Sequence, residues 1–532
     1  MARRAFHIRG RCVRRQPASK TEPINYRFLP GISQPQRHHG VEYMNQLNCL
    51  PQDAIFRGHD ILPTAVVSLD QHGIRRPSRT TAPHSMGLRN ALDALATRQI
   101  TATALTEQAL ERAEASKQLL NAFSAIDWDR ALKAAAESDR RYGESRQRAL
   151  EGLPIAVKDL IDTKGMETRY GSAAYLGHLP HADADIVKAL VERGAIIIGK
   201  TTTHEFAWGV TTASARFGDT LNPLDHARIP GGSSGGAAAA IAHGAIRAGV
   251  GTDTGGSVRI PAALCGIVGY KPTLGTLSTR GVFPLAPTCD HVGLLGEQVD
   301  DVLLLADAMD IKVPESDAWL SARLGVIRDI APVPLSPEIA AAFDGAMKRL
   351  AQDFACVNVS TSGLFDAVFG AFASIVLIEG GIEHFRRNDW DRISTRYNPE
   401  TVDRLKRAET MDLRAYAAAQ QTRRSFTTRL HEVMSTVDYL VLPTCPCTAP
   451  HLDAGTVSIG AWTGTVREAL MTYTAPFNVA GFPAISIPLA TGERSLPAAL
   501  QIVAKPGDDG ALLQIAQQME LMLRTGSAHK RR

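Results

Sequence analysis

The sequence predicts an α/β protein in which a largely buried sheet lies between layers of helices. Helical and strand-like segments alternate from residue 86 onward, and the strand-like segments are short apolar runs. Hydrophobic residues make up 44% of the 532 residues, as in globular proteins. No repeat of fixed period and no linker rich in Pro and Ser divides residues 86–532. We therefore expect one large folded domain over that range.

The elements can be placed along the chain from their periodicity and their end signals. Apolar residues recur at helical spacing after Met86, and 153–157 is an apolar run typical of a buried strand. The alanine run after Ser234 predicts a closely packed helix. The other predicted elements are helices at 184–193, 336–353, 400–434 and from 511, and strands at 195–198, 246–251, 324–329, 438–442, 483–488 and 498–503.

Residues 1–85 differ in composition from the rest of the chain. They carry thirteen Lys or Arg against five Asp or Glu, whereas residues 86–532 carry 45 against 49. No apolar period is sustained in this segment, so we expect a disordered basic extension or a mis-assigned start before Met86. The mildly acidic remainder argues against a nucleic-acid partner.

Cysteine usage and hydropathy favour a cytoplasmic protein. The seven cysteines form no CxxC pair, and no His cluster has metal-ligand spacing. No uninterrupted apolar run reaches the roughly 18 residues that a membrane helix needs. We therefore expect reduced thiols, no metal and no membrane span.

Two short motifs match known patterns without the structural context that those patterns need. "GAIIIGKT", Gly194 to Thr201, satisfies the nucleotide-binding pattern GxxxxGK[ST], but Ala-Ile-Ile-Ile favours a strand over a phosphate-binding loop, so we expect Lys200 to be solvated at a strand end. "GGSSGG", residues 231–236, satisfies GxSxG twice, but a loop with two prolines precedes it where a nucleophile elbow needs a strand. A nucleotide-binding module using Gly194 to Thr201 remains the alternative from another class.

A buried lysine and two serines form a more specific constellation. Ser257 lies 24 residues after Ser233, in a glycine turn between a predicted strand and a helical pattern, where consecutive backbone N–H groups suit a developing oxyanion. Lys158 ends an apolar run 75 residues before Ser233. Burial disfavours a charged amine, so this lysine can serve as a base. Together the three can activate a hydroxyl group.

Three stretches together resemble the amidase signature family of serine hydrolases: "LPIAVKD" (153–159), "PGGSSGGAAAAIAHGA" (230–245) and "GVGTDTGGSVRIPAALCGIVGYKPT" (249–273). The resemblance extends more weakly over residues 86–525. It implies a single large domain with a mixed, twisted central sheet covered by helices on both faces. It also implies hydrolysis of a carboxamide to a carboxylate and ammonia or an amine, without cofactor or metal.

The resemblance carries a Ser-cisSer-Lys triad onto this chain. Ser257 would attack the amide carbonyl and form an acyl-enzyme, Ser233 would relay the proton after a cis peptide bond, and Lys158 would be the base. The backbone N–H groups of Thr254, Gly255, Gly256 and Ser257 would form the oxyanion hole.

Several further residues are expected near this site. Ser234 would support the triad, and Asp253 with Arg259 would brace the loop as an ion pair. Trp208, Trp462 and Tyr473 could line the substrate pocket or pack in the core. His204 and His291 are expected to be structural or at the pocket edge, and Cys265 to fill the core.

The expected partner is a small-molecule amide, and a homodimer is compatible with the sequence. The alternative within the same family is the glutaminase subunit of a tRNA-dependent amidotransferase, which would pass ammonia to partner subunits. We favour the free-standing amidase because "FPLAPTCDHVG" (283–293) resembles free-standing members more than that subunit.

Overall fold

The computed structural model describes residues 86–328, 330–489 and 495–525. Residues Ser78–Arg532 form one compact unit. The expectations for residues 1–85 lie outside the described residues.

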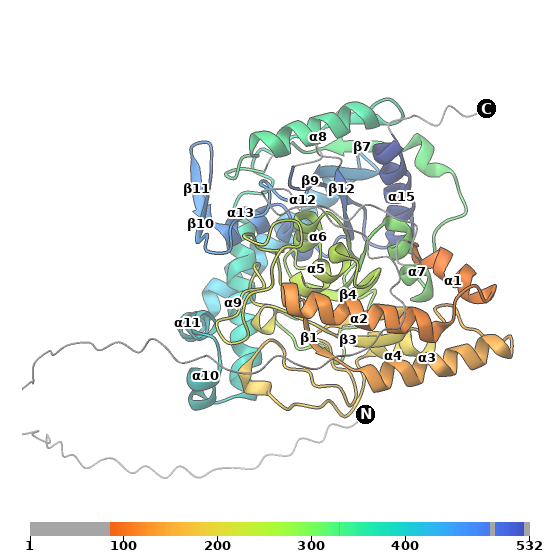
Figure 1. Ribbon diagram of the computed structural model, residues 1–532. Helices are drawn as coiled ribbons and strands as arrows, with labels where there is room; N and C mark the ends of the chain where they lie inside the picture. Colours follow the sequence, from red (N-terminus) through yellow and green to blue (C-terminus); the bar gives the residue numbers. More distant parts are fainter. Residues whose placement is uncertain (1–85, 329, 490–494, 526–532) are drawn as a thin grey trace, which may run out of the picture. The chain divides into compact units, whose positions relative to one another are not determined.

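An eleven-stranded sheet runs through the centre of this unit (Figure 1). From one edge to the other, its strands are β1 (Phe123–Ile126), β3 (Ile196–Thr201), β2 (Pro154–Lys158), β4 (Ala248–Asp253), β6 (His291–Gly296), β5 (Val268–Lys271), β12 (Ala484–Leu489), β13 (Ala498–Val503), β9 (Tyr439–Pro443), β7 (Arg323–Val326) and β8 (Ala355–Asn358). A separate ribbon pairs β10 (Thr456–Ile459) with β11 (Trp462–Thr465).

The sheet is mixed. β3, β2 and β4 are parallel neighbours, as are β9, β7 and β8, and the remaining pairs are antiparallel. The predicted α/β class is confirmed. Because β2 and β4 are adjacent and parallel, their carboxyl ends, Lys158 and Asp253, lie at the same edge of the sheet.

Helices cover both faces of the sheet. Gly269 and Tyr270 are consecutive in β5 and so point to opposite faces. A side chain at Gly269 would meet Ala262 of α6, whereas the Tyr270 hydroxyl donates to Asp509 of α15 at 2.6 Å. The helices are α1 (Leu88–Ala96), α2 (Ala102–Leu120), α3 (Trp128–Gly143), α4 (Asp185–Glu192), α5 (Gly235–His243), α6 (Arg259–Cys265), α7 (Val299–Ala308), α8 (Pro337–Leu350), α9 (Val368–Arg387), α10 (Trp390–Arg396), α11 (Pro399–Glu409), α12 (Leu413–Met434), α13 (Val466–Thr472), α14 (Ala475–Val479) and α15 (Asp509–Thr525).

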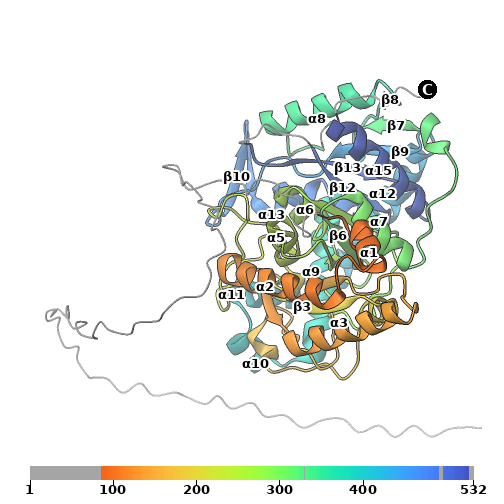
Figure 2. The same ribbon diagram turned by 45° about the vertical axis from the view of Figure 1, so that its right-hand side comes forward.

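Two long helical patterns in the sequence are each divided into two helices. The pattern after Met86 gives α1 and α2, because the Thr101 side chain accepts from the Ala104 amide at 3.0 Å and starts a new helix. The pattern over 400–434 gives α11 and α12, where Asp412 caps the second helix by accepting from Ala415 N at 2.7 Å. α1 and α7 lie side by side, as Figures 1 and 2 show.

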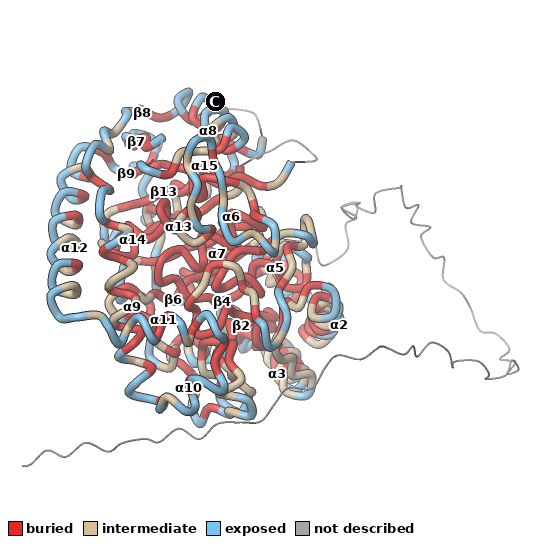
Figure 3. The backbone as a smooth tube through the Cα atoms, turned by 90° about the vertical axis from the view of Figure 1, so that its left-hand side faces the viewer, coloured by how far each residue is buried: buried red, intermediate tan, exposed pale blue. Residues whose placement is uncertain are grey.

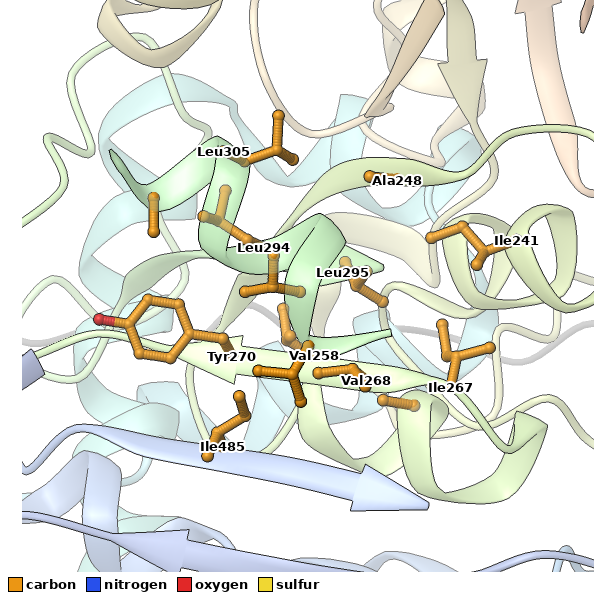
Figure 4. Close-up of a cluster of buried hydrophobic side chains, with 14 of the residues drawn as sticks. Ile241, Ala248, Val258, Ile267, Val268, Tyr270, Leu294, Leu295, Leu305 and Ile485 are labelled. Atoms are coloured by element: carbon orange, nitrogen blue, oxygen red, sulfur yellow. The ribbon is translucent and has the colours of Figure 1, made fainter. Parts of the chain in front are cut away.

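Apolar side chains fill most of the interior, where the buried residues gather (Figure 3). In the cluster of Figure 4, Leu294 and Leu295 of β6 lie near Val268 and Tyr270 of β5, and all four are fully buried. Burial of such side chains supplies most of the driving force for folding. The packed core also holds in place the sheet edge where the polar residues of the candidate site lie.

One described helix, α9, is long and apolar enough to cross a membrane by length and composition alone. Half of its most apolar stretch is buried inside the protein, where α9 packs along α12 and α11. Core helices of globular proteins pass the same test, so α9 is weak grounds for a membrane span.

Candidate active site

Lys158 ends β2, whose five residues are all buried. Its Nζ lies 2.7 Å from Ser233 Oγ and 2.7 Å from Thr252 Oγ1. Burial lowers the pKa of Lys158 to about 7, although Asp253 and Asp290 act to raise it. The amine is therefore close to half neutral at pH 7 and is hydrogen-bonded to a serine hydroxyl.

Ser233 lies in the glycine-rich loop before α5 and is fully buried. The peptide bond between Gly232 and Ser233 is cis. A Cβ atom at position 232 would lie 2.7 Å from Thr212 Oγ1 and 2.9 Å from Thr212 N, so only glycine fits against that segment. The Ser233 carbonyl accepts from His204 N at 3.3 Å, which fixes the loop on its other side.

Ser257 lies between β4 and α6 and is 4% exposed. Its carbonyl accepts from Ser234 N at 3.1 Å. The Ser234 hydroxyl lies 3.2 Å from Thr252 O and 3.3 Å from Thr252 N. Ser234 thus joins the two serine loops to β4, and the structure brings Lys158, Ser233 and Ser257 to one sheet edge.

The Asp253 carboxylate organises the loop that leads to Ser257. Its Oδ1 accepts from Gly256 N at 2.7 Å, and its Oδ2 accepts from Val258 N at 3.2 Å. The Gly256 amide, expected in the oxyanion hole, donates to this carboxylate in the structure, and its contact with an oxyanion stays a prediction. Among the residues that the structure describes, none accepts a hydrogen bond from the amides of Thr254, Gly255 and Ser257. These three amides are therefore available to donate to an oxyanion.

Arg259 holds Asp253 from the opposite side. Its Nη2 lies 2.9 Å from Asp253 Oδ1 and its Nε 3.0 Å from Oδ2, and both side chains are fully buried. The remaining guanidinium hydrogens reach Thr474 O, Gln501 Oε1 and Asn478 Oδ1. The pKa of Asp253 is held far below its usual range by Arg259, against the effect of burial. A fully satisfied buried pair of this kind fixes a loop rather than reacting.

Asp290 is a neighbour of the site that sequence reasoning missed. Its Oδ1 accepts from Thr254 Oγ1 at 2.6 Å, and its Oδ2 accepts from the amides of Leu285 and Ala286 at 2.9 and 3.0 Å. Burial raises its pKa. The one available signal was its place in "CDHVG", directly before a histidine. That histidine, His291, is buried, and its Nδ1 lies 2.7 Å from Cys289 O, as a structural residue would.

The three aromatic residues expected at the pocket occupy different settings. Trp208 is 2% exposed and stacks on His384 with ring centroids 5.7 Å apart. The Tyr473 hydroxyl is used by the backbone, donating to Val333 O at 2.7 Å, and Trp462 is half-buried in β11. Their contact with substrate stays a prediction.

A cavity of about 330 Å³ lies between α9, α13 and the segment Ile330–Pro332. Phe369 of α9 and Thr472 of α13 line it. A side chain at Gly255 would overlap Phe372 of α9 and Met471 of α13, so these two helices reach the loop directly. A smaller cavity of about 40 Å³ touches Thr252, Thr254 and Asp290.

The segment Gly194 to Thr201 does not form a phosphate-binding loop. Residues Ile196–Thr201 are the buried strand β3. Lys200 is fully buried, not solvated as expected, because β3 is covered on both sides; its Nζ donates to Ile161 O and to Thr163 Oγ1. Among the described residues, no group of three His, Cys, Asp or Glu side chains could hold a metal ion.

Comparison with known proteins identifies the family. Residues 104–513 match the family model described as Amidase. A glutamyl-tRNA(Gln) amidotransferase subunit from Chloroflexus aurantiacus is 33% identical over 82% of this chain and 96% of its own length. The AtzE subunit of 1-carboxybiuret hydrolase from Pseudomonas sp. is 33% identical over 81% and 97%. A solved crystal structure of an amidase shares 34% identity with a TM-score of 0.75, covering 82% of this chain and all of that chain. The chain therefore belongs to the amidase signature family of hydrolases that act on carbon–nitrogen bonds, in which the Ser-cisSer-Lys triad is a family feature.

Proposed function

We propose that the protein hydrolyses a small carboxamide through an acyl-enzyme on Ser257. Ser257 Oγ attacks the carbonyl carbon while its proton passes through Ser233 to the neutral amine of Lys158. The backbone N–H groups of Thr254, Gly255 and Ser257 donate hydrogen bonds to the developing oxyanion. Lys158 then returns the proton through Ser233 to the leaving nitrogen, the carbon–nitrogen bond breaks, and water releases the carboxylate by the reverse relay.

The observation that carries this proposal is the contact between Lys158 Nζ and Ser233 Oγ at 2.7 Å. A charged lysine would only donate to this hydroxyl, whereas a neutral lysine can also accept its proton. With a pKa of about 7, the neutral form is available at physiological pH. Ser234 would support the relay by holding the two serine loops together, and Asp253 with Arg259 would hold the oxyanion loop.

A glutaminase subunit of an amidotransferase is the second candidate, because several similar proteins bear the name of an amidotransferase subunit. The two functions differ in partner and substrate. A free-standing amidase hydrolyses amides as a monomer or homodimer, whereas a glutaminase subunit needs partner subunits to use its ammonia. Sedimentation of the chain from its native extract, followed by an assay for glutamine hydrolysis, separates them. A chain that sediments with partner subunits and hydrolyses glutamine but no other amide would favour the second candidate.

We also propose that residues 86–532 form the catalytic domain, that the protein is cytoplasmic, and that it can form a homodimer. The domain is supported by one compact unit over Ser78–Arg532 and by a family match over residues 104–513. Fractionation of source cells tests the location, and sedimentation equilibrium tests the oligomeric state.

The proposed activity is tested with the full chain against a panel of aliphatic, aryl and carbamoyl amides, with ammonia or amine release as the readout. Ser257→Ala is expected to abolish hydrolysis and labelling by a fluorophosphonate. Continued labelling of the folded variant would overturn the assignment of Ser257 as nucleophile.

A further inference from the structure

α13 carries a guanidinium group without a bonded counter-ion. Arg467 is half-buried at the first turn of this helix, and it forms no hydrogen bond or ion pair with any residue in the described part of the chain. Arg404 differs, because it donates to the Trp208 carbonyl and pairs with Glu400. Burial, together with the neighbouring Arg404, lowers the pKa of Arg467 to about 10. The guanidinium group stays charged at neutral pH although burial and Arg404 disfavour its charged form. A bound anion would stabilise that form.

The helix places Arg467 close to the oxyanion loop. Arg467 and Met471 are four residues apart in α13, so they lie on the same helix face, about 6 Å apart along the axis. Met471 abuts Gly255, since a side chain at that glycine would overlap Met471 Cε. Arg467 therefore lies about one helical turn from Met471, the α13 residue that packs against the oxyanion loop.

A second series of contacts leads from Ser233, through His204, to the surroundings of Arg467. His204 N donates to Ser233 O at 3.3 Å, and His204 Nε2 lies 3.3 Å from Glu400 Oε2. Glu400 pairs with Arg404 and interacts electrostatically with Arg467. We call Glu400, Arg404 and Arg467 the arginine cluster.

The helix α9 spans both regions. Phe372 abuts Gly255, and eight residues later Gly380 abuts the ring of Trp208, whose carbonyl binds Arg404. Eight helical residues span about 12 Å. The arginine cluster and the oxyanion loop thus lie within the length of a small substrate.

The arginine cluster has an excess of positive charge. It holds two guanidinium groups against one carboxylate, and Arg407 adds a third cation to the field at Arg467. The Glu400 side chain is 56% exposed, so the cluster reaches solvent. A substrate can therefore approach it.

We propose that Arg467 binds a carboxylate carried by the amide substrate, so that the enzyme prefers amides with an anionic group roughly 6–12 Å from the scissile bond. This inference rests on the proposed amidase function and names the substrate class of that site. Guanidinium groups bind carboxylates with paired, charge-assisted hydrogen bonds, and no residue in the described part of the chain accepts a hydrogen bond from the Arg467 guanidinium. The carboxylate could be on the acyl part or on the amine part of the substrate. The test uses one set of substrates for each position.

The test compares matched substrates on the full chain. In one arm, monoamides of the linear dicarboxylic acids from adipate to sebacate are compared with neutral fatty amides of equal length. In the other arm, N-acetyl ω-amino acids are compared with N-acetyl alkylamines. We expect the carboxylate to raise kcat/KM by about 10- to 100-fold in one arm, which is the effect of one charge-assisted contact.

Variants assign that preference to Arg467. Arg467→Met is expected to remove the preference and leave hydrolysis of the neutral amide unchanged, and Arg467→Lys to keep part of it. Lys406→Met is the matched control, since Lys406 is an exposed cation of α11 paired only with Asp403. It is expected to keep the full preference. No preference in the wild type, or a preference that survives Arg467→Met, would overturn the inference.

Two readouts separate this inference from the proposed function. Hydrolysis of neutral amides with no preference for carboxylates overturns the inference alone, whereas a folded chain without hydrolysis and without fluorophosphonate labelling of Ser257 overturns the proposed function. Calorimetric titration with glutarate and adipate needs no turnover. We expect binding that is lost in Arg467→Met, and equal heats in both proteins would contradict the inference.

Discussion

Replacing Lys158 by methionine removes the proposed base while keeping side-chain length and an apolar stem. The change deletes the hydrogen bonds to Ser233 Oγ and Thr252 Oγ1, each 2.7 Å long. Lowering a lysine pKa from 10.5 to about 7 raises the neutral fraction at pH 7 from about 1 in 3,000 to about one half. General base catalysis contributes about 10²- to 10⁴-fold. We expect Lys158→Met to lower kcat by that factor while the protein stays folded.

Lys200→Met is a matched control within the same sheet. Lys200 is also fully buried, it lies opposite Val157 of β2, and burial lowers its pKa to about 8. It contacts Ile161 and Thr163 and no member of the triad. We therefore expect folded Lys200→Met to keep kcat within about tenfold of the wild type.

The assay is the initial rate of ammonia release from an amide that the wild type hydrolyses, with circular dichroism to measure the folded fraction. The reasoning is refuted if folded Lys158→Met keeps more than about a tenth of wild-type kcat. It is also refuted if both variants lose activity equally, because burial of an amine would then explain the loss without a relay.

Three further predictions concern pH and the glycine-rich loop. Because Lys158 must be neutral to act, kcat/KM should rise with pH through about 7 and then level off; a flat profile between pH 5 and 9 argues against a lysine base. The negative charge of Asp290 raises the pKa of Lys158, so Asp290→Asn should move this rise to lower pH, and an unchanged or higher midpoint would contradict the electrostatic coupling. Gly232→Ala places a Cβ 2.7 Å from Thr212 Oγ1 and should displace the relay serine, with loss of activity in a folded protein. Gly345→Ala, in open space within α8, should leave activity unchanged, and comparable activity of the two variants would show that the close fit at 232 is unimportant.

The site could be predicted from the sequence where strand ends and short loops fix it. Lys158 ends an apolar run and Ser257 follows another. Because the strands that these runs form, β2 and β4, are adjacent and parallel, both residues lie at the same edge of the sheet. The spacing of the motifs and their resemblance to a family supplied the rest. The α/β class followed in the same way from alternating periodicity.

Other features depend on contacts between distant segments, which periodicity does not describe. The Gly256 amide binds Asp253 because Arg259 and Asn478 hold that carboxylate in place, and Asn478 lies 225 residues from Asp253 in the chain. Lys200 follows a glycine at a strand end, which favours a solvated lysine, yet it is fully buried and its Nζ donates to Ile161 O and Thr163 Oγ1 from another segment of the chain. The contact of α13 with the oxyanion loop, through Met471, follows only from how that helix packs.

Intact-protein mass spectrometry of a quenched reaction tests the account most directly. After rapid acid quench of a turning-over amide, the wild type should show a mass increase equal to the acyl group, located to the peptide that contains Ser257. Folded Ser257→Ala should show no such increase. An acyl group on Ser233 or on any other residue of the wild type, or an adduct that persists in Ser257→Ala, would contradict the central claim.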